Sequence, residues 1–193
     1  MFNVPYKSSN GSAWIPIESW LLPEGKLFIE GEITEETANE FIQKLMYMKK
    51  EKPEEKIWIY VNSRGGEVNA GMLIYDAIKG LKTETDIICT GIAASMAAII
   101  LAGGQRGHRF ILPHSKVMIH EPLVAGGIGG SATTIQRTAE SILETKRVSV
   151  ELLASDTGKS IEDVEKAISF DNFMNAQEAV AFGICDGIIT DFV

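Results

Sequence analysis

The sequence predicts a layered α/β fold in a single domain. Short apolar runs of strand length alternate with stretches of helical periodicity, and this order recurs to the C-terminus without a linker or low-complexity tract. With 193 residues, 45% of them hydrophobic, the chain is long enough to bury one core. We therefore expect residues 1–193 to form one domain, with 1–24 as an N-terminal segment and 25–193 as the core.

The first strand and helix are predicted directly after the N-terminal segment. Residues 26–33 are typical of a strand, and Thr34 is suited to cap the helix that follows. Glu35 and Glu36 in its first turn interact favourably with the positive end of the helix dipole. The helix has one apolar face, which is expected to pack on the sheet; it consists of Ala38, Phe41, Ile42 and Leu45.

Two strand-to-helix turns follow in tandem. Residues 57–61 form an apolar run that predicts a strand covered on both faces, ended by the polar and glycine residues at 62–66. Residues 68–81 then return as a helix. Residues 87–92 predict a second buried strand, which leads through Ser95 into a short apolar helix.

The C-terminal half continues with shorter elements. They are strands at 109–112 and 116–119, a glycine-rich loop at 126–130, a long helix from Ser131 or Thr133 to about Ser155, and helices at about 160–168 and 176–181. The second strand delivers His120 to a strand end, and the last two helices flank Asp171.

Composition narrows the class of protein. The formal charge is 18 − 26 = −8, without long runs of Lys or Arg, so nucleic acid is not an expected partner. The first 24 residues lack the basic and apolar blocks of a secretory signal, and the longest apolar run, 92–102, is too short for a bilayer. Cys89 and Cys185 have no second thiol or histidine at ligand spacing, which favours buried, reduced thiols and no metal. We expect a soluble cytoplasmic protein that does not bind membranes.

Ser95 is the first candidate catalytic residue. It lies where a buried strand turns into a helix, so its hydroxyl can leave the turn while backbone N–H groups face a developing anion. Small neighbours leave room for a substrate carbonyl, although the G-x-S-x-G elbow is not met; they are Gly91, Ala93, Ala94 and Ala97. From this local pattern alone, an ordinary N-cap serine is the better explanation.

His120 and Asp171 are the candidates for the groups that would activate Ser95. His120 follows an apolar run at a strand end, where α/β proteins place ligands, although packed histidines are commoner there. Asp171 lies among bulky apolar residues, and a buried carboxylate needs a partner. An imidazole donating to it would leave its other nitrogen free to deprotonate Ser95. The acids that remain alternatives to Asp171 are Asp156, Asp163 and Asp186.

Glycines near the second strand allow two interpretations. A Gly65-Gly66 pair after a strand is by default a turn. It can also form an oxyanion hole, in which the N–H groups of Gly66 and Met96 each contribute about 3 kcal/mol. The loop at 126–130 lacks the lysine of a P-loop and the context of a dinucleotide site, so it is interpreted as a flexible loop beside the substrate.

Four motifs together resemble the ClpP family, the proteolytic subunits of ATP-dependent Clp proteases. The resemblance extends from about residue 26 to 189 and keeps the motifs in the family's order. The motifs are Tyr60-Val61-Asn62-Ser63-x-Gly65-Gly66, Gly91-x-Ala93-Ala94-Ser95-Met96-Ala97, Met118-Ile119-His120-x-Pro122 and Asp171-x-Phe173-Met174.

The resemblance implies a ClpP/crotonase-like fold of repeated ββα units, with a protruding handle helix within about residues 121–156. It implies a serine endopeptidase that cleaves unfolded proteins and peptides, preferably after apolar side chains. Its triad would be Ser95, His120 and Asp171, and its oxyanion hole the N–H groups of Gly66 and Met96.

The resemblance also implies partners. Two stacked heptameric rings of this chain would enclose the active sites, and an AAA+ unfoldase of the Clp type would feed in substrates. ATP would be used by that unfoldase, so no cofactor is expected in this subunit.

Some positions differ from the family's pattern. Arg64 replaces a proline, Phe170 replaces an arginine, and the N-terminal segment is shorter. These differences motivate an alternative to the active peptidase: a catalytically weak or regulatory second paralogue in mixed rings with a typical ClpP. Glu121 replaces a glutamine, and its carboxylate would raise the pKa of His120 if it pointed inward. A crotonase-type acyl-CoA enzyme is a further alternative, against which the complete Ser-His-Asp set argues.

Overall fold

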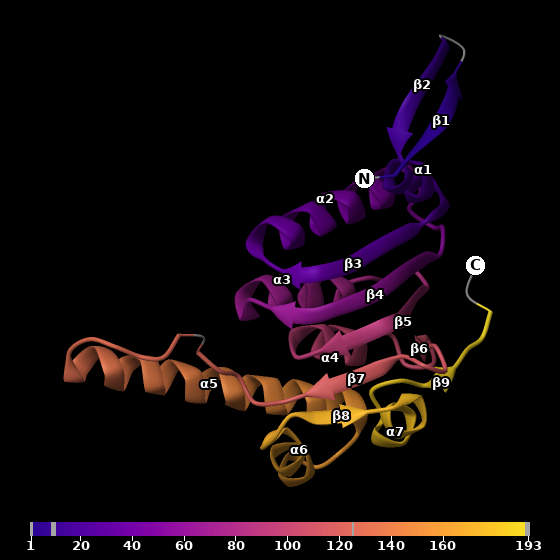
Figure 1. Cartoon of the computed structure of the whole chain (residues 1–193). Helices are drawn as coiled ribbons and strands as arrows, with labels where there is room; N and C mark the ends of the chain where they lie inside the picture. Colours follow the sequence, from indigo (N-terminus) through magenta and orange to yellow (C-terminus); the bar gives the residue numbers. More distant parts are fainter. Residues whose placement is uncertain (1, 9–10, 125, 192–193) are drawn as a thin grey trace.

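The protein consists of a mainly parallel β-sheet with helices packed on it (Figure 1). The computed structural model describes residues 2–8, 11–124 and 126–191. The strands run in the order β3-β4-β5-β6-β9, and β7 pairs with both β5 and β8. Only the β7–β8 pairing in this sheet is antiparallel. The strands are β3 (Lys26–Ile33), β4 (Ile57–Gly66), β5 (Thr85–Ala94), β6 (Arg109–Ile111), β7 (Lys116–Ile119), β8 (Asn172–Met174) and β9 (Gly187–Ile188).

Helices follow the first three of these strands and lie behind the sheet in Figure 1. The helices after the N-terminal segment are α2 (Glu35–Glu51), α3 (Val68–Lys79), α4 (Met96–Ala102), α5 (Ala132–Thr157), α6 (Ile161–Ile168) and α7 (Ala176–Phe182). One end of α5 extends beyond the rest of the molecule (Figure 1). The predicted α/β class and the protruding helix are confirmed.

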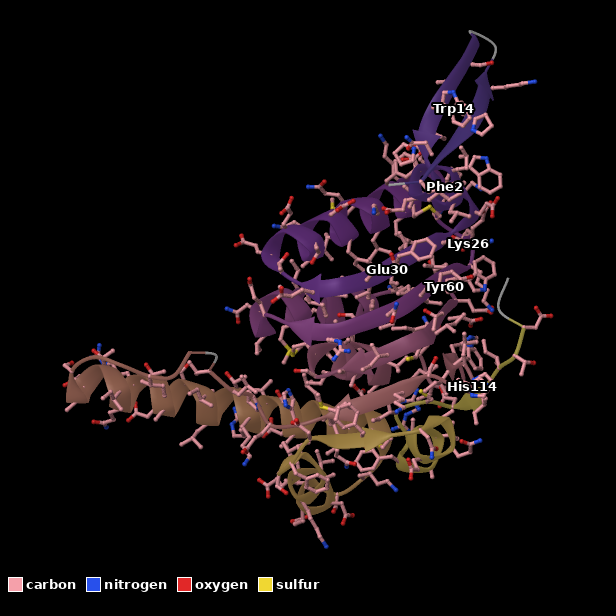
Figure 2. All side chains as sticks on the ribbon, in the orientation of Figure 1. Phe2, Trp14, Lys26, Glu30, Tyr60 and His114 are labelled. Carbon is pink, nitrogen blue, oxygen red and sulfur yellow. The ribbon has the colours of Figure 1, made fainter. Side chains whose placement is uncertain are left out.

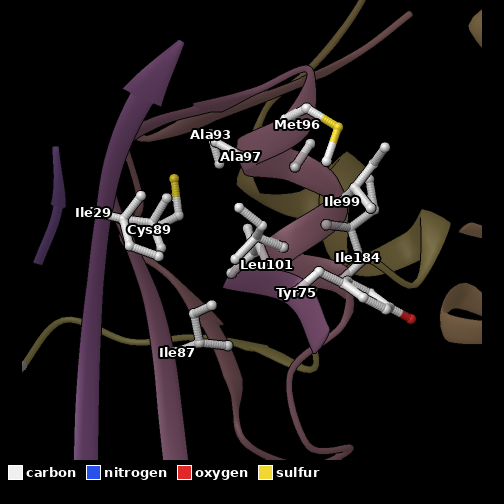
Figure 3. Packing of buried hydrophobic residues seen from close by; sticks show 14 of the residues in the cluster. Ile29, Tyr75, Ile87, Cys89, Ala93, Met96, Ala97, Ile99, Leu101 and Ile184 are labelled. Carbon is white, nitrogen blue, oxygen red and sulfur yellow. The ribbon is translucent and has the colours of Figure 1, made fainter. Parts of the chain in front are cut away.

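The core lies between the sheet and these helices (Figure 3). Ile29 and Cys89 from the strands face α4, every residue of which is buried. A helix that is apolar all round needs such a position, covered on all sides. Cys89 and Cys185 are both buried and free, as the sequence predicts.

The N-terminal segment forms a hairpin that the sequence did not predict. It consists of β1 (Asn3–Ser8) and β2 (Gly11–Pro16), followed by α1 (Ile17–Leu21) and a 3-10 turn at Leu22–Glu24. The hairpin projects from the body; Trp14 within it and Phe2 directly before it are each 72% exposed (Figure 2). The described side chains of the hairpin are not buried on either face, so its strands need no alternation of apolar and polar residues. Without that alternation, the sequence pattern does not indicate strands here. The predicted domain also includes residues 1, 9, 10, 125, 192 and 193, which lie outside the described residues.

Strand β4 runs further than predicted, through the polar and glycine residues expected to end it. Against β3, Gly31 pairs with Ser63 and Glu32 pairs with Gly65, so Arg64 is an extra residue in a β-bulge. Ser63 Oγ accepts a hydrogen bond from Gly65 N (3.0 Å) and donates one to Gly31 O (2.6 Å). Its hydroxyl therefore holds the bulge, which bends the end of the strand.

No helix in the described part of the chain is long and apolar enough to cross a membrane.

Candidate active site

Ser95 occupies a strained turn between β5 and α4. Its φ is 55° and its ψ −124°, and it is the one non-glycine residue with positive φ in the described ranges. Such a conformation costs about 1–3 kcal/mol and persists only where the surroundings enforce it. Ser95 N donates to Met118 O at 2.9 Å, which ties the turn to β7.

The side chain of Ser95 does not cap α4, although the residue stands at the N-cap position. Its Oγ lies 3.0 Å from Nε2 of His120. The ordinary N-cap explanation, which was the better one from local sequence, is therefore wrong. The strained turn directs the hydroxyl at the imidazole, away from the helix amides.

Antiparallel pairing of β7 and β8 brings His120 and Asp171 together. Ile119 pairs with Asn172, so the residues just beyond this pair lie opposite each other. Nδ1 of His120 is 3.1 Å from Oδ1 of Asp171, and the imidazole is 17% exposed. The structure thus places the three predicted side chains in one hydrogen-bonded row.

Asp171 differs from the prediction in one respect, because it is not buried. Its side chain is 67% exposed. Phe170 and Phe173, whose bulk suggested an enclosed acid, are themselves 59% and 56% exposed. Apolar neighbours in sequence therefore did not enclose the carboxylate, since they project from the surface of this chain.

None of the alternative acids meets His120: two pair with other side chains and the third lies on α6. Asp156 accepts from Tyr75 and pairs with Lys79, while Asp186 pairs with Arg109. Asp163 lies in the first turn of α6, where its backbone N–H donates to the capping Ser160. Sequence could not choose among these carboxylates, but the fold brings only Asp171 to His120.

The other two histidines lie away from Ser95. His114 precedes β7, at the end of the strand opposite His120 (Figure 2). Nδ1 of His108 is 2.7 Å from Oδ1 of Asp86, and with Glu84 they form the one group with metal-ligand spacing that the described residues contain. The Lys56 ammonium pairs with both carboxylates of this group, at 2.6 and 2.9 Å, and so already supplies a positive charge there.

Gly65 lets the backbone of β4 lie directly against the Ser95 turn. A Cβ at Gly65 would come within 2.8 Å of Ser95 Cβ and 3.1 Å of Met96 N, and the residue has φ 91°. Met96 N is the first amide of α4 and has no acceptor within the helix. Gly66 and Met96 line the same cavity as Ser95, so both predicted oxyanion donors lie at the site.

The site opens into a cavity of about 380 Å³. Its apolar lining includes Met96, Ile99, Met118, Leu123 and Leu153. Three charged residues also line it: Glu32, Arg64 and Glu67. Sequence reasoning noted Arg64 only as an unusual residue and missed both glutamates, because nothing local indicates that β3 and β4 end at this cavity.

Glu121 does not turn toward the imidazole beside it in the chain. Its Oε2 is 2.7 Å from Nζ of Lys146 on α5, and its backbone N–H donates to Ile168 O at 2.9 Å. The carboxylate therefore links the segment after β7 to the long helix. The inward orientation that the sequence left open for this carboxylate is therefore not adopted.

The sequence was also compared with models of known protein families. The sequence model of the family described as Clp protease matches residues 9–192, nearly the whole chain, and this range includes every residue of the site described above.

Proposed function

Because the chain belongs to the Clp protease family and is a ClpP-like peptidase, we propose that it cleaves peptide bonds by a serine mechanism. The observation that carries this proposal is the 3.0 Å approach of Ser95 Oγ to His120 Nε2 from a turn with strained backbone. The hydroxyl of Ser95 is thus directed at a base and is not used to cap α4.

In the proposed reaction, Nε2 of His120 takes the proton of Ser95 as Oγ attacks the scissile carbonyl. The bond from Oγ to the carbonyl carbon forms, and the carbonyl electron pair moves onto oxygen. The N–H groups of Gly66 and Met96 would stabilise this oxyanion. The imidazolium then protonates the leaving amine as the C–N bond breaks, which leaves the acyl group on Ser95 Oγ. Water attacks this ester and gives a proton to His120, and the bond to Oγ breaks as the imidazolium returns the proton to Ser95.

Asp171 has a supporting role in this mechanism. Accepting from Nδ1–H of His120 at 3.1 Å, it would hold the tautomer whose Nε2 is free to act as base. Its negative charge would also stabilise the imidazolium that forms during the attack.

The assembly is part of the proposal. We propose stacked heptameric rings fed with unfolded polypeptides by an AAA+ unfoldase in the cytoplasm, with ATP used by that partner. Helix α5 supports self-association, since it extends from the body and exposes Ile135 and Leu143, 43% and 65% accessible in this chain. Exposed apolar side chains on one projecting element favour contact with another subunit.

Ser95→Ala tests the nucleophile. Hydrolysis of a short fluorogenic peptide should fall by at least about a thousandfold, because the covalent step is lost, while circular dichroism and native mass stay unchanged. Ser155→Ala is the matched control, since Ser155 is exposed and outside the cavity lining.

Two outcomes would contradict the proposal. Retained hydrolysis in Ser95→Ala would exclude Ser95 as the nucleophile. An inactive wild-type protein that increases or decreases the activity of a typical ClpP after mixing would support the regulatory subunit instead.

A further inference from the structure

Three charged side chains lie in the wall of the active-site cavity. Glu32, Arg64 and Glu67 line the cavity with Ser95 and His120. None of the three makes a side-chain hydrogen bond or ion pair with the residues that the structure describes. Within the described part of the chain their charges are therefore not paired, and they can interact with a molecule in the cavity.

The fold places these residues at the cavity through the ends of β3 and β4. Arg64 is the extra residue of the β-bulge, and Glu32 follows the bulge on the paired strand. Bulges commonly re-aim side chains beside active sites. Glu67 comes directly after β4 at the N-cap of α3, yet its side chain makes no capping bond.

The cavity combines an apolar part with a net negative wall. Met96, Ile99 and Leu153 supply apolar surface. The two glutamates and the one arginine of the wall together carry a formal charge of 1 − 2 = −1. A Lys or Arg side chain matches both parts, because it has an apolar stem and a cationic end. The chain's net charge of −8 also favours the approach of cationic peptides.

We propose that Glu32 and Glu67 make this cavity select a basic side chain next to the scissile bond. This inference rests on the proposed peptidase function and revises the expected preference for purely apolar side chains. Arg64 acts in the opposite direction, because its guanidinium repels the same cation.

The test compares two fluorogenic peptides that differ only in the residue before the scissile bond, lysine or norleucine. The two side chains share a four-carbon stem, so the ratio of their kcat/KM values isolates the ammonium group. The wild-type ratio should favour lysine by about fivefold, as expected for exposed charge pairs. Glu32→Gln and Glu67→Gln should each lower the ratio about twofold to fivefold, whereas Arg64→Gln should raise it.

Glu54→Gln is the matched control. It makes the same change in net charge, but Glu54 precedes β4 at the opposite end of the strand and does not line the cavity. Its ratio should equal that of the wild type. A ratio near one in the wild type, or one unchanged by both cavity variants, would overturn the inference.

Failure of the inference is distinguishable from failure of the peptidase proposal. Equal cleavage of both peptides that disappears in Ser95→Ala would leave the peptidase intact and remove only the selectivity. If the wild type cleaves neither peptide, the ratio is measured as the Kd of fluorescein-labelled lysine and norleucine peptides on Ser95→Ala. Equal affinities, or no binding of either peptide, would again overturn the selectivity.

Discussion

At the scale of single residues, the strained turn at Ser95 depends on a glycine from another strand. The backbone of Gly65 approaches Ser95 Cβ so closely that no side chain fits between them. A serine hydroxyl can be held at an imidazole only if the turn cannot relax into an ordinary helix cap, where the side chain would bond to the amides of α4. The neighbouring strand therefore enforces the geometry that local sequence would not adopt.

Gly65→Ala should lower peptide hydrolysis by at least about a hundredfold, because the new Cβ displaces the Ser95 turn and a 1 Å misplacement of reacting groups can cost that much. Steady-state kcat/KM measures the loss. Gly107→Ala is the control, since the φ of 87° at Gly107 resembles the 91° at Gly65. Apart from its two chain neighbours, no heavy atom of the described residues would lie within 4 Å of a Cβ at Gly107.

The control separates backbone strain from the clash. Gly107→Ala should lose about 1–2 kcal/mol of stability from the left-handed conformation and keep its activity. Equal activity of the two variants would show that the approach of Gly65 to Ser95 has no role in positioning the hydroxyl.

At the scale of elements, helix α2 shows how local sequence sets a boundary. Thr34 Oγ1 accepts from Thr37 N, and Thr37 Oγ1 accepts from Thr34 N, which forms a reciprocal capping box. The helix starts where the sequence predicts. The start is predictable because Thr34 and Thr37, which form the capping box, are only three residues apart in the sequence. The helix packs behind β3, whose C-terminal end carries Glu32 to the cavity.

Thr34→Ala should lower the free energy of unfolding by about 1 kcal/mol, since one backbone N–H of the first turn loses its acceptor. Urea denaturation followed by circular dichroism measures it. Thr133→Ala near the start of α5 is the control, because Thr133 is exposed and makes no side-chain bond in the described part of the chain. A loss no larger at Thr34 than at Thr133 would mean that the capping box contributes nothing.

At the scale of the whole molecule, one buried cation joins segments distant in sequence. Arg109 on β6 is 4% exposed and donates to the carbonyls of Ala102 and Asp156, at 3.0 and 2.9 Å. It also pairs with Asp186, just before β9. The network ties the ends of α4 and α5 to the edge of the sheet, and so fixes the base from which α5 projects.

Asp186→Asn should lower the free energy of unfolding by about 3 kcal/mol at pH 7, because it leaves the buried Arg109 without its counter-charge. Burial alone would raise the pKa of Asp186, but the hydrogen bonds from Arg109 outweigh burial and lower it. The ionised carboxylate therefore stabilises the fold above its unfolded pKa of about 3.9. This contribution is lost as the pH falls through the still lower folded pKa.

Urea unfolding of wild type and variant across this pH range measures the effect. The difference between the two proteins should be largest near neutrality and shrink as the carboxylate becomes protonated. A difference that stays constant from pH 7 to below pH 3 would show that the charge of Asp186 has no part in the stability.

The sequence by itself determined the α/β class, the boundaries of most helices and the candidate residues Ser95 and His120. These features are local, because strand and helix periods, caps and glycine positions are encoded within a few residues of each other. The four motifs and their order also indicated the Clp protease family, and the family match over residues 9–192 shows it.

The tertiary structure alone decided which carboxylate meets His120, and that Asp171 is exposed. It also decided the short strands β8 and β9, of three and two residues, which exist only through their ladder partners. The bulge at Arg64 and the convergence of Glu32 and Glu67 on the cavity belong with these features. All of them depend on pairings between strands far apart in the chain, and no local pattern specifies such a register.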